Sequence, residues 1–455
     1  MSDPLERRDE EPAALAYVLE EAQRYLGELD ESLVLPSRER GFGGGLPEDG
    51  DGALAALAEL VERSVSATRS SGPRFFHFVT GGTTPAALGA DWLTSLLDQN
   101  SFSAVSSPYG AELEDVAIRW LLDLYDLPGD WGGVLTTGAT MANFVGLAAA
   151  RRWWAERHGV DIDERGFAGL PEVSVFSTPY IHASAHKALA MLGIGRASPQ
   201  VGSVDWIEQA LAALRGAPAI LIGNAGDVNT GDFDPLDRMA DLAAQHGAWL
   251  HVDGAFGLFA RVTPRAAALA AGVERADSLI ADGHKWLNVP YDCGFAFVRD
   301  PTYLRPPFQL TGAYLPTDER PSPEASRRAR SLAVWATLRA YGRSGYRAMV
   351  ERHLQLAERL GRRIEEQPDF ELLAPVRLNI VCFRHRPLGV GDEELDTHNL
   401  ELGQAVLDDG RVFFGTTRYE GKVAFRPAIV NWRTTERDVD LIVDVLAELA
   451  ARRSG

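Results

Sequence analysis

Lysine is scarce in this chain of 455 residues. It occurs three times, as Lys187, Lys285 and Lys422, whereas the other 42 of the 45 basic residues are arginine. Arginine therefore supplies positive charge almost everywhere. Lysine differs from arginine because its amine can lose a proton and attack a carbonyl. Each lysine is thus either one of a few chance surface cations or a residue whose amine is needed for chemistry.

Cysteine, long apolar runs and net positive charge are also lacking. Cys293 and Cys382 are the two cysteines, and they form no metal-ligand pattern, so no metal site is predicted and a reducing cytoplasm is expected. We find no run of about 18 apolar residues, and the start MSDPLERRDE is charged, so neither a membrane span nor a secretory signal is expected. A net charge of −19 argues against nucleic acid and anionic membranes as partners.

The first part of the chain is predicted to be an N-terminal arm, residues 1–73. Residues 12–30 have apolar positions at helical spacing, and residues 41–53 are Gly-rich and acidic, which indicates a loop. With 45% hydrophobic and 24% charged residues, the whole chain has the composition of an ordinary globular protein. Its length allows more than one domain.

Short apolar segments alternate with helical patterns from about Phe75 onward. Strands are expected at 132–138, 172–178, 217–226, 248–257, 277–282 and 294–299, and helices at 140–156, 182–193 and 235–247. Continuous apolar strands separated by helices predict an α/β fold, a mostly parallel sheet with helices on both faces. This region is predicted to be the large domain, residues 74–330.

The pattern changes near residue 300. Residues 306–324 are Pro-rich and polar and are expected to form a mobile loop or a crossover. A long helical region follows at roughly 324–366, then strand-like segments at 377–385 and 422–430, and a closing helix from about Thr435. We predict a smaller C-terminal α+β domain, residues 331–455.

Four groups of candidate residues follow strands of the predicted sheet, where open α/β folds bind ligands. They are the turn of Gly138, Ala139 and Thr140, then His182, Asp253 and Lys285. The turn opens a helix, and backbone N–H groups at a helix N-terminus can bind a phosphate. Taken singly, each group also has a structural explanation: the turn and Asp253 fit capping, and His182 fits packing or capping.

Together the four groups meet the requirements of pyridoxal phosphate. This cofactor needs an amine for its aldehyde, an acid facing its pyridine nitrogen, a phosphate cradle and a flat group over its ring. Lys285 would supply the amine and Asp253 the acid, which keeps the ring nitrogen protonated. The turn at 138–140 would hold the phosphate, and His182 would lie over the ring.

The chain resembles the group II pyridoxal-phosphate-dependent amino acid decarboxylases, such as the aromatic amino acid, histidine and glutamate decarboxylases. The motifs are ADSLIADGHKWLNVPYDCG at 276–294, WLHVDGAFG at 249–257, TGDFDPL at 230–236 and SPYGAELEDVAIRWLLDLYDLP at 107–128. The resemblance extends over nearly the whole chain from about residue 70. It implies a fold-type I homodimer with interfacial active sites, pyridoxal 5'-phosphate as cofactor and an amino acid as the small-molecule substrate.

The resemblance also implies roles for single residues. Lys285 takes the Schiff-base position, Asp253 the ring-nitrogen position and His182 the stacking position. Further cofactor contacts are implied for Ala139, Thr140, Ala255 and His284. Lys187 and Lys422 are expected on the surface.

Other implied residues concern the substrate and the proton. Phe78 and Phe102 fall where relatives line the substrate pocket, although both also fit core packing. Relatives carry a tyrosine on a mobile loop that reprotonates the substrate carbon, and that loop corresponds to 303–320 here. Tyr314 is the expected proton donor and Tyr303 is the competing tyrosine.

Two carboxylates depart from the family pattern. Asp227 replaces a threonine that relatives often have near the cofactor, and it is counted here among the cofactor-binding residues. Asp282 stands where some relatives have asparagine, near the phosphate. An extra carboxylate at either place changes the local charge.

The expected function is decarboxylation of an L-amino acid to the amine and CO2. Phe78, Phe102 and Val79 favour an aromatic or other apolar side chain, whereas the acidic balance and Asp227 leave a basic one open. Aldehyde synthase, aminotransferase or carbon–carbon lyase activity on the same scaffold is the alternative. A further alternative is that the protein is a non-catalytic member of the family.

Overall fold

The computed structural model describes residues 10–35, 45–64, 69–310, 312–315 and 319–454. Residues 41–44 of the expected Gly-rich loop, and residues 311 and 316–318 of the expected Pro-rich stretch, lie outside the described residues. The chain divides into two compact units. The large unit comprises Gly81–Glu358 and Ala374–Cys382, and the small unit comprises the described residues of Met1–Thr80, Arg359–Leu373 and Phe383–Gly455. The three domain boundaries given above stay predictions.

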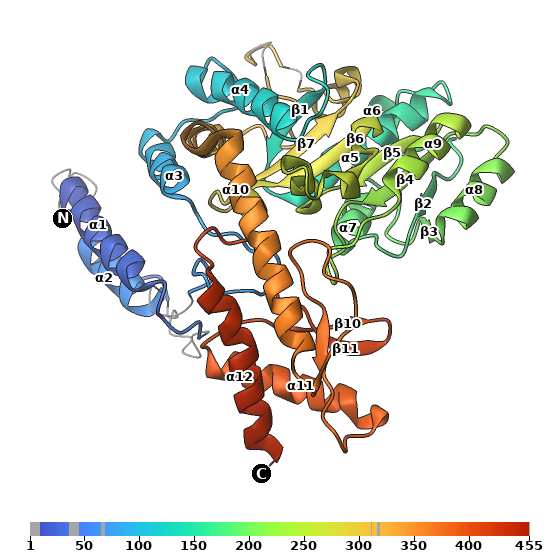
Figure 1. Ribbon diagram of the computed structural model, residues 1–455. Coiled ribbons are helices and arrows are strands. Elements are labelled where there is room, and N and C mark those ends of the chain that lie inside the picture. The colour runs from blue at the N-terminus through green and yellow to red at the C-terminus, as the bar shows by residue number, and fades with distance from the viewer. Residues whose placement is uncertain (1–9, 36–44, 65–68, 311, 316–318, 455) are drawn as a thin grey trace. The chain divides into compact units, whose positions relative to one another are not determined.

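A seven-stranded sheet forms the centre of the large unit, in the order β1-β7-β6-β5-β4-β2-β3 (Figure 1). Its strands are β1 (Gly132–Thr136), β2 (Ser174–Ser177), β3 (Pro199–Val201), β4 (Ala219–Asn224), β5 (Trp249–Asp253), β6 (Ser278–Asp282) and β7 (Gly294–Val298). Neighbouring strands run parallel except at β7, which is antiparallel to β1 and β6. The predicted mostly parallel sheet is confirmed, and the carboxyl ends of the other six strands share one edge.

Helices cover both faces of this sheet. The helices of the large unit are α3 (Pro85–Leu97), α4 (Pro108–Leu124), α5 (Ala139–Glu156), α6 (Ile162–Arg165), α7 (Ala183–Met191), α8 (Val204–Ala213) and α9 (Leu236–His246), and α10 (Ser331–Glu365) contributes to both units. Along β4, Ile220 and Ile222 pack into the same core cluster as α5. A side chain at the neighbouring Gly223 would meet Leu236 and Met239 of α9. Because successive strand residues face opposite sides, α5 and α9 lie on opposite faces.

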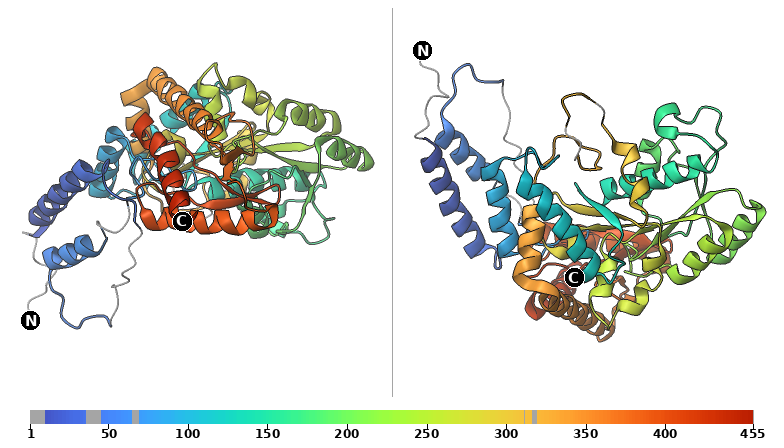
Figure 2. Two further views of the ribbon diagram at one scale, coloured as in Figure 1. Left: turned by 60° about the horizontal axis from the view of Figure 1, so that its bottom comes forward. Right: turned by 90° about the horizontal axis from the view of Figure 1, so that it is seen from above.

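The small unit is built around a four-stranded antiparallel sheet, in the order β10-β11-β9-β8. Its strands are β8 (Phe370–Leu372), β9 (Phe383–His385), β10 (Thr416–Tyr419) and β11 (Lys422–Phe425), and its helices include α1 (Glu10–Glu28), α2 (Ala53–Ser64), α11 (Asp392–Asp409) and α12 (Glu436–Ser454). Helix α11 packs against this sheet and against α12 (Figure 2). The expected C-terminal α+β fold is therefore present.

The long helix starts later than its sequence pattern suggests. It was expected from about residue 324, but α10 begins at Ser331. The backbone before it is bonded elsewhere, because Arg327 N donates to Asn100 Oδ1 (2.9 Å) and Ser101 N donates to Arg327 O (3.0 Å). These bonds hold the segment extended and prevent a helical turn.

The expected strand at 377–385 is also shorter, since only β9 forms. Leu378 and Ile380 are buried, and they lie beside Gly231. Their apolar character thus reflects packing against a loop of the large unit, and the only strand-like pairing of the two is a single bridge at Ile380. No helix in the described part of the chain is long and apolar enough to cross a membrane.

Candidate active site at the carboxyl edge of the large sheet

The predicted cofactor residues gather at the carboxyl edge of the seven-stranded sheet. Asp253 is the last residue of β5, and Asp282 is the last residue of β6. Gly138 follows β1 and is the N-cap of α5, while His182 follows β2 and is the N-cap of α7. Lys285 lies in a short π-helical turn, Gly283–Leu287, directly after β6. Since these strands point the same way, the side chains converge at one edge.

The Lys285 amine is half-buried and lies beside a carboxylate. Its Nζ is 3.5 Å from Asp282 Oδ2 and 5.8 Å from the ring centroid of Phe256. The backbone is held from the other side, because a Cβ on Gly81 would come within 1.9 Å of the Lys285 carbonyl oxygen. Gly81 N also donates to His284 O at 3.2 Å. The candidate amine is thus carried on a closely packed segment of backbone.

The start of α5 has the form of an anion site. Gly138 has a φ of +142° and, as a glycine, no side chain to cap the helix, and a Cβ there would lie 2.9 Å from His284 Cε1. Ala139 N donates to Asp282 Oδ1 at 3.0 Å, and Thr140 is half-buried in the first helical turn. The N–H groups and the positive end of the helix dipole suit a phosphate. One of these N–H groups, that of Ala139, already donates its hydrogen bond to the Asp282 carboxylate.

The Asp253 carboxylate is buried and held by two donors. Ala255 N donates to Oδ1 at 3.1 Å, and Asn143 Nδ2 donates to Oδ2 at 2.8 Å. These bonds compensate part of the cost of burying the charge. Each carboxylate oxygen keeps a further lone pair with which to accept a ring N–H. The Ala255 carbonyl accepts from Asp282 N at 2.9 Å, so this one residue links the two carboxylate-bearing strand ends.

His182 presents an exposed imidazole at the same edge. Its Nδ1 accepts from Ser184 N at 3.2 Å and lies 2.7 Å from Ser184 Oγ. The capping interpretation of His182 is therefore correct. It is compatible with stacking, because a bond to a ring nitrogen lies in the ring plane and the residue is exposed.

Asp227 is bonded to its own loop. Its Oδ2 accepts from Asn229 N (2.9 Å), Thr230 N (3.0 Å) and Thr230 Oγ1 (3.1 Å). Its place among the cofactor-binding residues stays a prediction. Close by, burial and then the charges of Asp227 and Asp232 raise the pKa of Asp234 to about 6, although Asn224 N donates to its Oδ2 at 2.8 Å.

The two candidate tyrosines lie in different surroundings. Tyr314 is 89% exposed. Tyr303 packs edge-on against Trp249, with 5.7 Å between ring centroids. Trp249 is the first residue of β5 and Asp253 the last, so the two are about 13 Å apart at the usual rise per strand residue. Tyr303 is therefore at the amino edge, which excludes it as the proton donor in this conformation.

The remaining predicted residues are placed as follows. Lys187 and Lys422 are exposed, as expected. Phe102 is buried in the large unit, and its carbonyl accepts from Arg320 N at 2.9 Å. Phe78 belongs to the small unit, is 63% exposed and packs on His77, with 4.0 Å between ring centroids. The substrate-pocket roles of Phe78 and Phe102 stay predictions.

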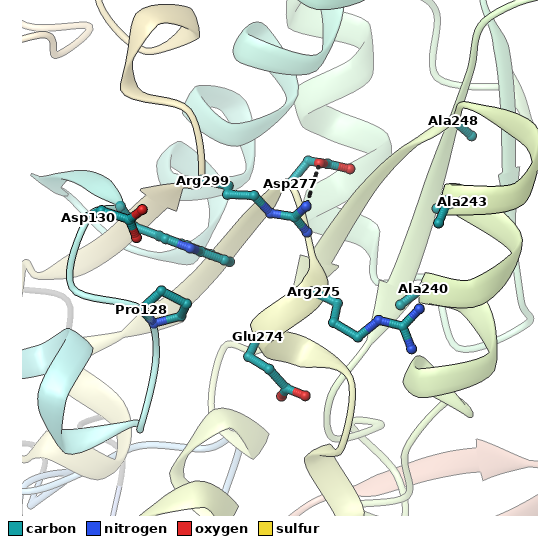
Figure 3. A pocket seen from close by; sticks show the side chains of 11 residues that line it. Pro128, Asp130, Ala240, Ala243, Ala248, Glu274, Arg275, Asp277 and Arg299 are labelled. Carbon is teal, nitrogen blue, oxygen red and sulfur yellow. Dashed lines mark ion pairs between the residues drawn. The ribbon is translucent and has the colours of Figure 1, made fainter.

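A hollow of about 390 Å³ opens at the amino edge of the sheet, and Figure 3 shows its lining. Trp131, Ala248 and Asp277 directly precede β1, β5 and β6, and they line it together with Arg299. Arg299 Nη1 lies 3.6 Å from Asp277 Oδ1. None of the predicted cofactor residues lines this hollow, so it is separate from the candidate site.

Sequence reasoning missed four polar residues that stand behind Asp253: Asn143, Ser184, His251 and Ser278. A signal was present for two of them. Asn143 follows Ala139 by four residues and so shares its helix face, and His251 precedes Asp253 by two residues and so shares its strand face.

The donor set fits pyridoxal phosphate. Four groups converge at one edge of the sheet. They are an amine, a buried carboxylate that accepts two hydrogen bonds, an exposed flat ring and a helix start with a glycine. The narrow space at Gly138, where a Cβ would strike His284, is the close backbone approach that a phosphate site needs. Lys285, Asp253, His182 and the 138–140 turn are therefore the groups that would hold the cofactor.

Comparison with known proteins identifies relatives of similar length. The chain is similar to an aromatic-L-amino-acid decarboxylase of Bacillus atrophaeus, with 28% identity over 89% of this chain and 87% of the relative. A phenylacetaldehyde synthase of Arabidopsis thaliana is 29% identical over 84% of this chain and 83% of its own. An L-2,4-diaminobutyrate decarboxylase of Rhizobium meliloti (strain 1021) is 30% identical over 89% and 83%.

Solved structures share the fold. The crystal structure of Oryza sativa TDC with PLP and tryptamine superposes with a TM-score of 0.91, at 24% identity, and covers 100% of both chains. The expected fold class is thus confirmed. The family model described as the pyridoxal-dependent decarboxylase conserved domain matches residues 48–386. With most of its length matched, the chain belongs to the pyridoxal-phosphate-dependent decarboxylases.

Proposed function

We propose that this protein is a cytoplasmic homodimer that decarboxylates an aromatic L-amino acid to its amine and CO2. The observation that carries the proposal is the convergence of Lys285, Asp253 and His182 at the carboxyl edge, in a chain of the decarboxylase family. Family membership supports an amino acid as the substrate. The side-chain class, the assembly and the compartment are the proposed parts.

Each residue of the site has a proposed task. Lys285 would hold the cofactor covalently through its amine, whose Nζ lies 3.5 Å from Asp282 Oδ2. Asp253 accepts the ring N–H and keeps that nitrogen protonated, while His182 fixes the ring plane from one face. The chemistry that bound pyridoxal phosphate would supply is a site for the electron pair that the departing CO2 leaves behind. The N–H groups of the 138–140 turn bind the phosphate.

Tyr314 is the proposed donor of the proton to the α carbon. The Tyr314 side chain is 89% exposed, so no packing prevents its phenol from approaching a bound substrate. A positioned acid contributes about 10²–10⁴-fold to the rate. The second candidate is an aldehyde synthase, in which molecular oxygen and water convert the amino acid to aldehyde, CO2, ammonia and hydrogen peroxide. The similarity to a phenylacetaldehyde synthase supports it.

The substrate class rests on two kinds of support. The relative from Bacillus atrophaeus is an aromatic-L-amino-acid decarboxylase, and the predicted pocket residues Phe78 and Phe102 are aromatic. The relative from Rhizobium meliloti acts on L-2,4-diaminobutyrate, which is basic. Because the Asp227 carboxylate is engaged with its own loop, we favour the aromatic substrate.

Exposed apolar helices support the homodimer. Helix α3 exposes Leu93 (53%), Leu96 (66%) and Leu97 (52%), which is unusual for a surface that stays in water. Helices α1 and α2 pack against each other and contain no buried residue. A second copy of the chain would cover such faces. The cytoplasm is supported by two buried free cysteines.

A product assay tests the proposed function. Purified protein loaded with pyridoxal phosphate is incubated with L-tryptophan, L-tyrosine, L-phenylalanine, L-2,4-diaminobutyrate and L-glutamate, and amine, CO2, aldehyde and ammonia are measured. We expect amine and CO2 in equal amounts from an aromatic substrate. Aldehyde with ammonia and no amine would replace the proposal by the aldehyde synthase, and turnover of diaminobutyrate alone would replace the substrate class.

A further inference from the structure

A line of buried polar side chains runs behind Asp253. Trp249, His251 and Asp253 alternate along β5, so all three face the side of the sheet that α5 covers. Asn143 projects from α5 between Asp253 and His251. His251, Asn143 and Ser278 are fully buried. Buried polar groups are costly unless they are bonded, so the pattern of their hydrogen bonds carries information.

The direction of each hydrogen bond follows from its neighbour. An ionised Asp253 only accepts, so the Asn143 atom 2.8 Å from its Oδ2 is the amide nitrogen. The amide oxygen then faces His251 Nε2 at 2.8 Å, which requires a proton on Nε2. His251 Nδ1 therefore accepts from Ser278 Oγ (2.8 Å), and Ser278 Oγ accepts from Trp249 Nε1 (2.9 Å). All four bonds donate toward Asp253, so each polarises the next.

The environment of His251 keeps this arrangement unique. Burial lowers the pKa of His251 to about 4, so its ring is neutral near pH 7 and holds one tautomer. Gly146, one helical turn after Asn143, leaves room for the ring. A Cβ on Gly146 would lie 2.7 Å from His251 Cε1 and 2.9 Å from Nδ1. The absence of a side chain at Gly146 thus leaves the space that the His251 ring fills.

A second branch leads from the same amide nitrogen to His182. Asn143 Nδ2 also donates to Ser184 Oγ at 3.1 Å, and Ser184 Oγ lies 2.7 Å from His182 Nδ1. Since Ser184 N donates to that Nδ1 as well, the proton of a neutral His182 ring is on Nε2. One amide nitrogen therefore contacts both branches, one ending at Asp253 and the other at His182.

We infer that Asn143 is a positioning residue that couples the Asp253 carboxylate to the His182 ring, with His251 fixing the orientation of its amide. The inference rests on the proposed cofactor roles of Asp253 and His182. Without Asn143, the ionised form of Asp253 loses a donor, and His251 Nε2–H is left buried and unpaired. Asp253 and His182 then hold the cofactor ring less firmly.

The variant Asn143→Ala tests the inference on the full-length protein. Apoprotein is titrated with pyridoxal phosphate, and the visible circular dichroism band of the bound cofactor is recorded. We expect the dissociation constant to rise by about ten-fold or more, because a buried charge-assisted bond is lost, and the band to change in shape. Asn399→Ala is the matched control, since Asn399 is also fully buried and makes three hydrogen bonds, in the small unit. It should leave both readouts unchanged.

A second variant covers the case in which Asn143→Ala does not fold. Gly146→Ala keeps Asn143 and favours the helix, yet it pushes on the His251 ring. We expect weaker cofactor binding in the same direction. The inference would be overturned if either variant folds and still shows the wild-type affinity for pyridoxal phosphate and the wild-type circular dichroism band.

The tautomer of His251 gives a test that does not need the cofactor. Nuclear magnetic resonance of histidine-labelled apoprotein should show the His251 proton on Nε2 in the wild type. A proton on Nδ1 would overturn the inference by itself. Absence of any cofactor band in the wild type would instead contradict the proposed function, so the two failures are distinguishable.

Discussion

At the scale of single residues, Asp253 and Asp282 end neighbouring strands but have different surroundings. Asp253 accepts from Asn143 and Ala255, and its oxygens keep further lone pairs with which to accept a ring N–H. Asp282 lies at the N-terminus of α5, where it accepts from Ala139 N. That is the place expected for the phosphate. A carboxylate there competes with the phosphate for N–H groups and repels its charge.

Replacing Asp282 by asparagine should therefore strengthen cofactor binding. The change removes a negative charge beside the phosphate, and it frees the Lys285 amine from an ion pair at 3.5 Å. We expect the dissociation constant for pyridoxal phosphate to fall by about ten-fold, as measured by titration of the apoprotein. Asp277→Asn, at the amino edge, is the control and should have no effect. Equal or weaker binding by the Asp282 variant would contradict this account of the phosphate site.

The raised pKa of Asp234, about 6, makes a prediction about stability and pH. A carboxyl whose folded pKa is raised stabilises the fold below its unfolded pKa, and this contribution is lost as the pH rises through about 6. In Asp234→Asn the side chain does not titrate, so the stability of this variant does not fall as the pH rises through about 6. Relative to the wild type, its free energy of unfolding should increase by about 2 kcal/mol between about pH 4 and pH 7. Urea unfolding at both pH values measures this, and parallel pH curves would refute it.

At the scale of elements, the sequence was informative where burial and periodicity coincide. The strands ending at Asp253 and Asp282 and the helix after Gly138 were all predicted within a few residues of their observed bounds. The polar line behind Asp253 was not predicted. Asn143 lies among apolar residues of α5, and only the packing of α5 on β5 brings its amide to His251. A single sequence contains no signal for that pairing of elements.

A buried ion pair joins α4 to the segment before α10. Glu114 Oε1 accepts from Arg327 Nη2 and from Leu135 N, each at 3.0 Å, and both charged side chains are at most 3% exposed. Removing one partner of such a pair leaves an uncompensated charge. Glu114→Gln should therefore lower the free energy of unfolding by about 3–5 kcal/mol, measured by urea denaturation.

The exposed pair of Arg238 and Glu208 provides the control for that measurement. Its side chains are 46% and 45% exposed, with 2.9 Å between Nη2 and Oε2. Glu208→Gln should change the free energy of unfolding by less than about 1 kcal/mol. Similar losses in the two variants would mean that burial of the Glu114 pair has no special weight.

At the scale of the whole molecule, the α/β class and the family were within reach of the sequence because the motifs occur in the order of the strands. The HVDGA and HKW motifs end neighbouring strands, β5 and β6, and so meet in space. The position of Tyr314 relative to the site could not be predicted from the sequence, because it depends on a loop whose conformation the local sequence does not determine. The assembly of the protein likewise depends on which apolar faces meet.

The exposed face of α3 gives a prediction about assembly. The wild type should sediment at twice its chain mass of 49.5 kDa. Leu96→Glu places a charge on that face and should shift the protein toward the monomer, because burying an unpaired charge is costly. Leu388→Glu is the control, since Leu388 is 96% exposed in the small unit. A wild-type monomer with full activity would contradict the homodimer.

The central claim is that Lys285, at the carboxyl edge of the sheet, carries the cofactor. Borohydride reduction of the protein loaded with pyridoxal phosphate, followed by peptide mapping in the mass spectrometer, tests it most directly. Because the chain contains three lysines, the label has three possible lysine attachment sites. The account predicts one phosphopyridoxyl group on Lys285 and none on Lys187 or Lys422. A label on either of those two, or an unlabelled Lys285, would contradict it.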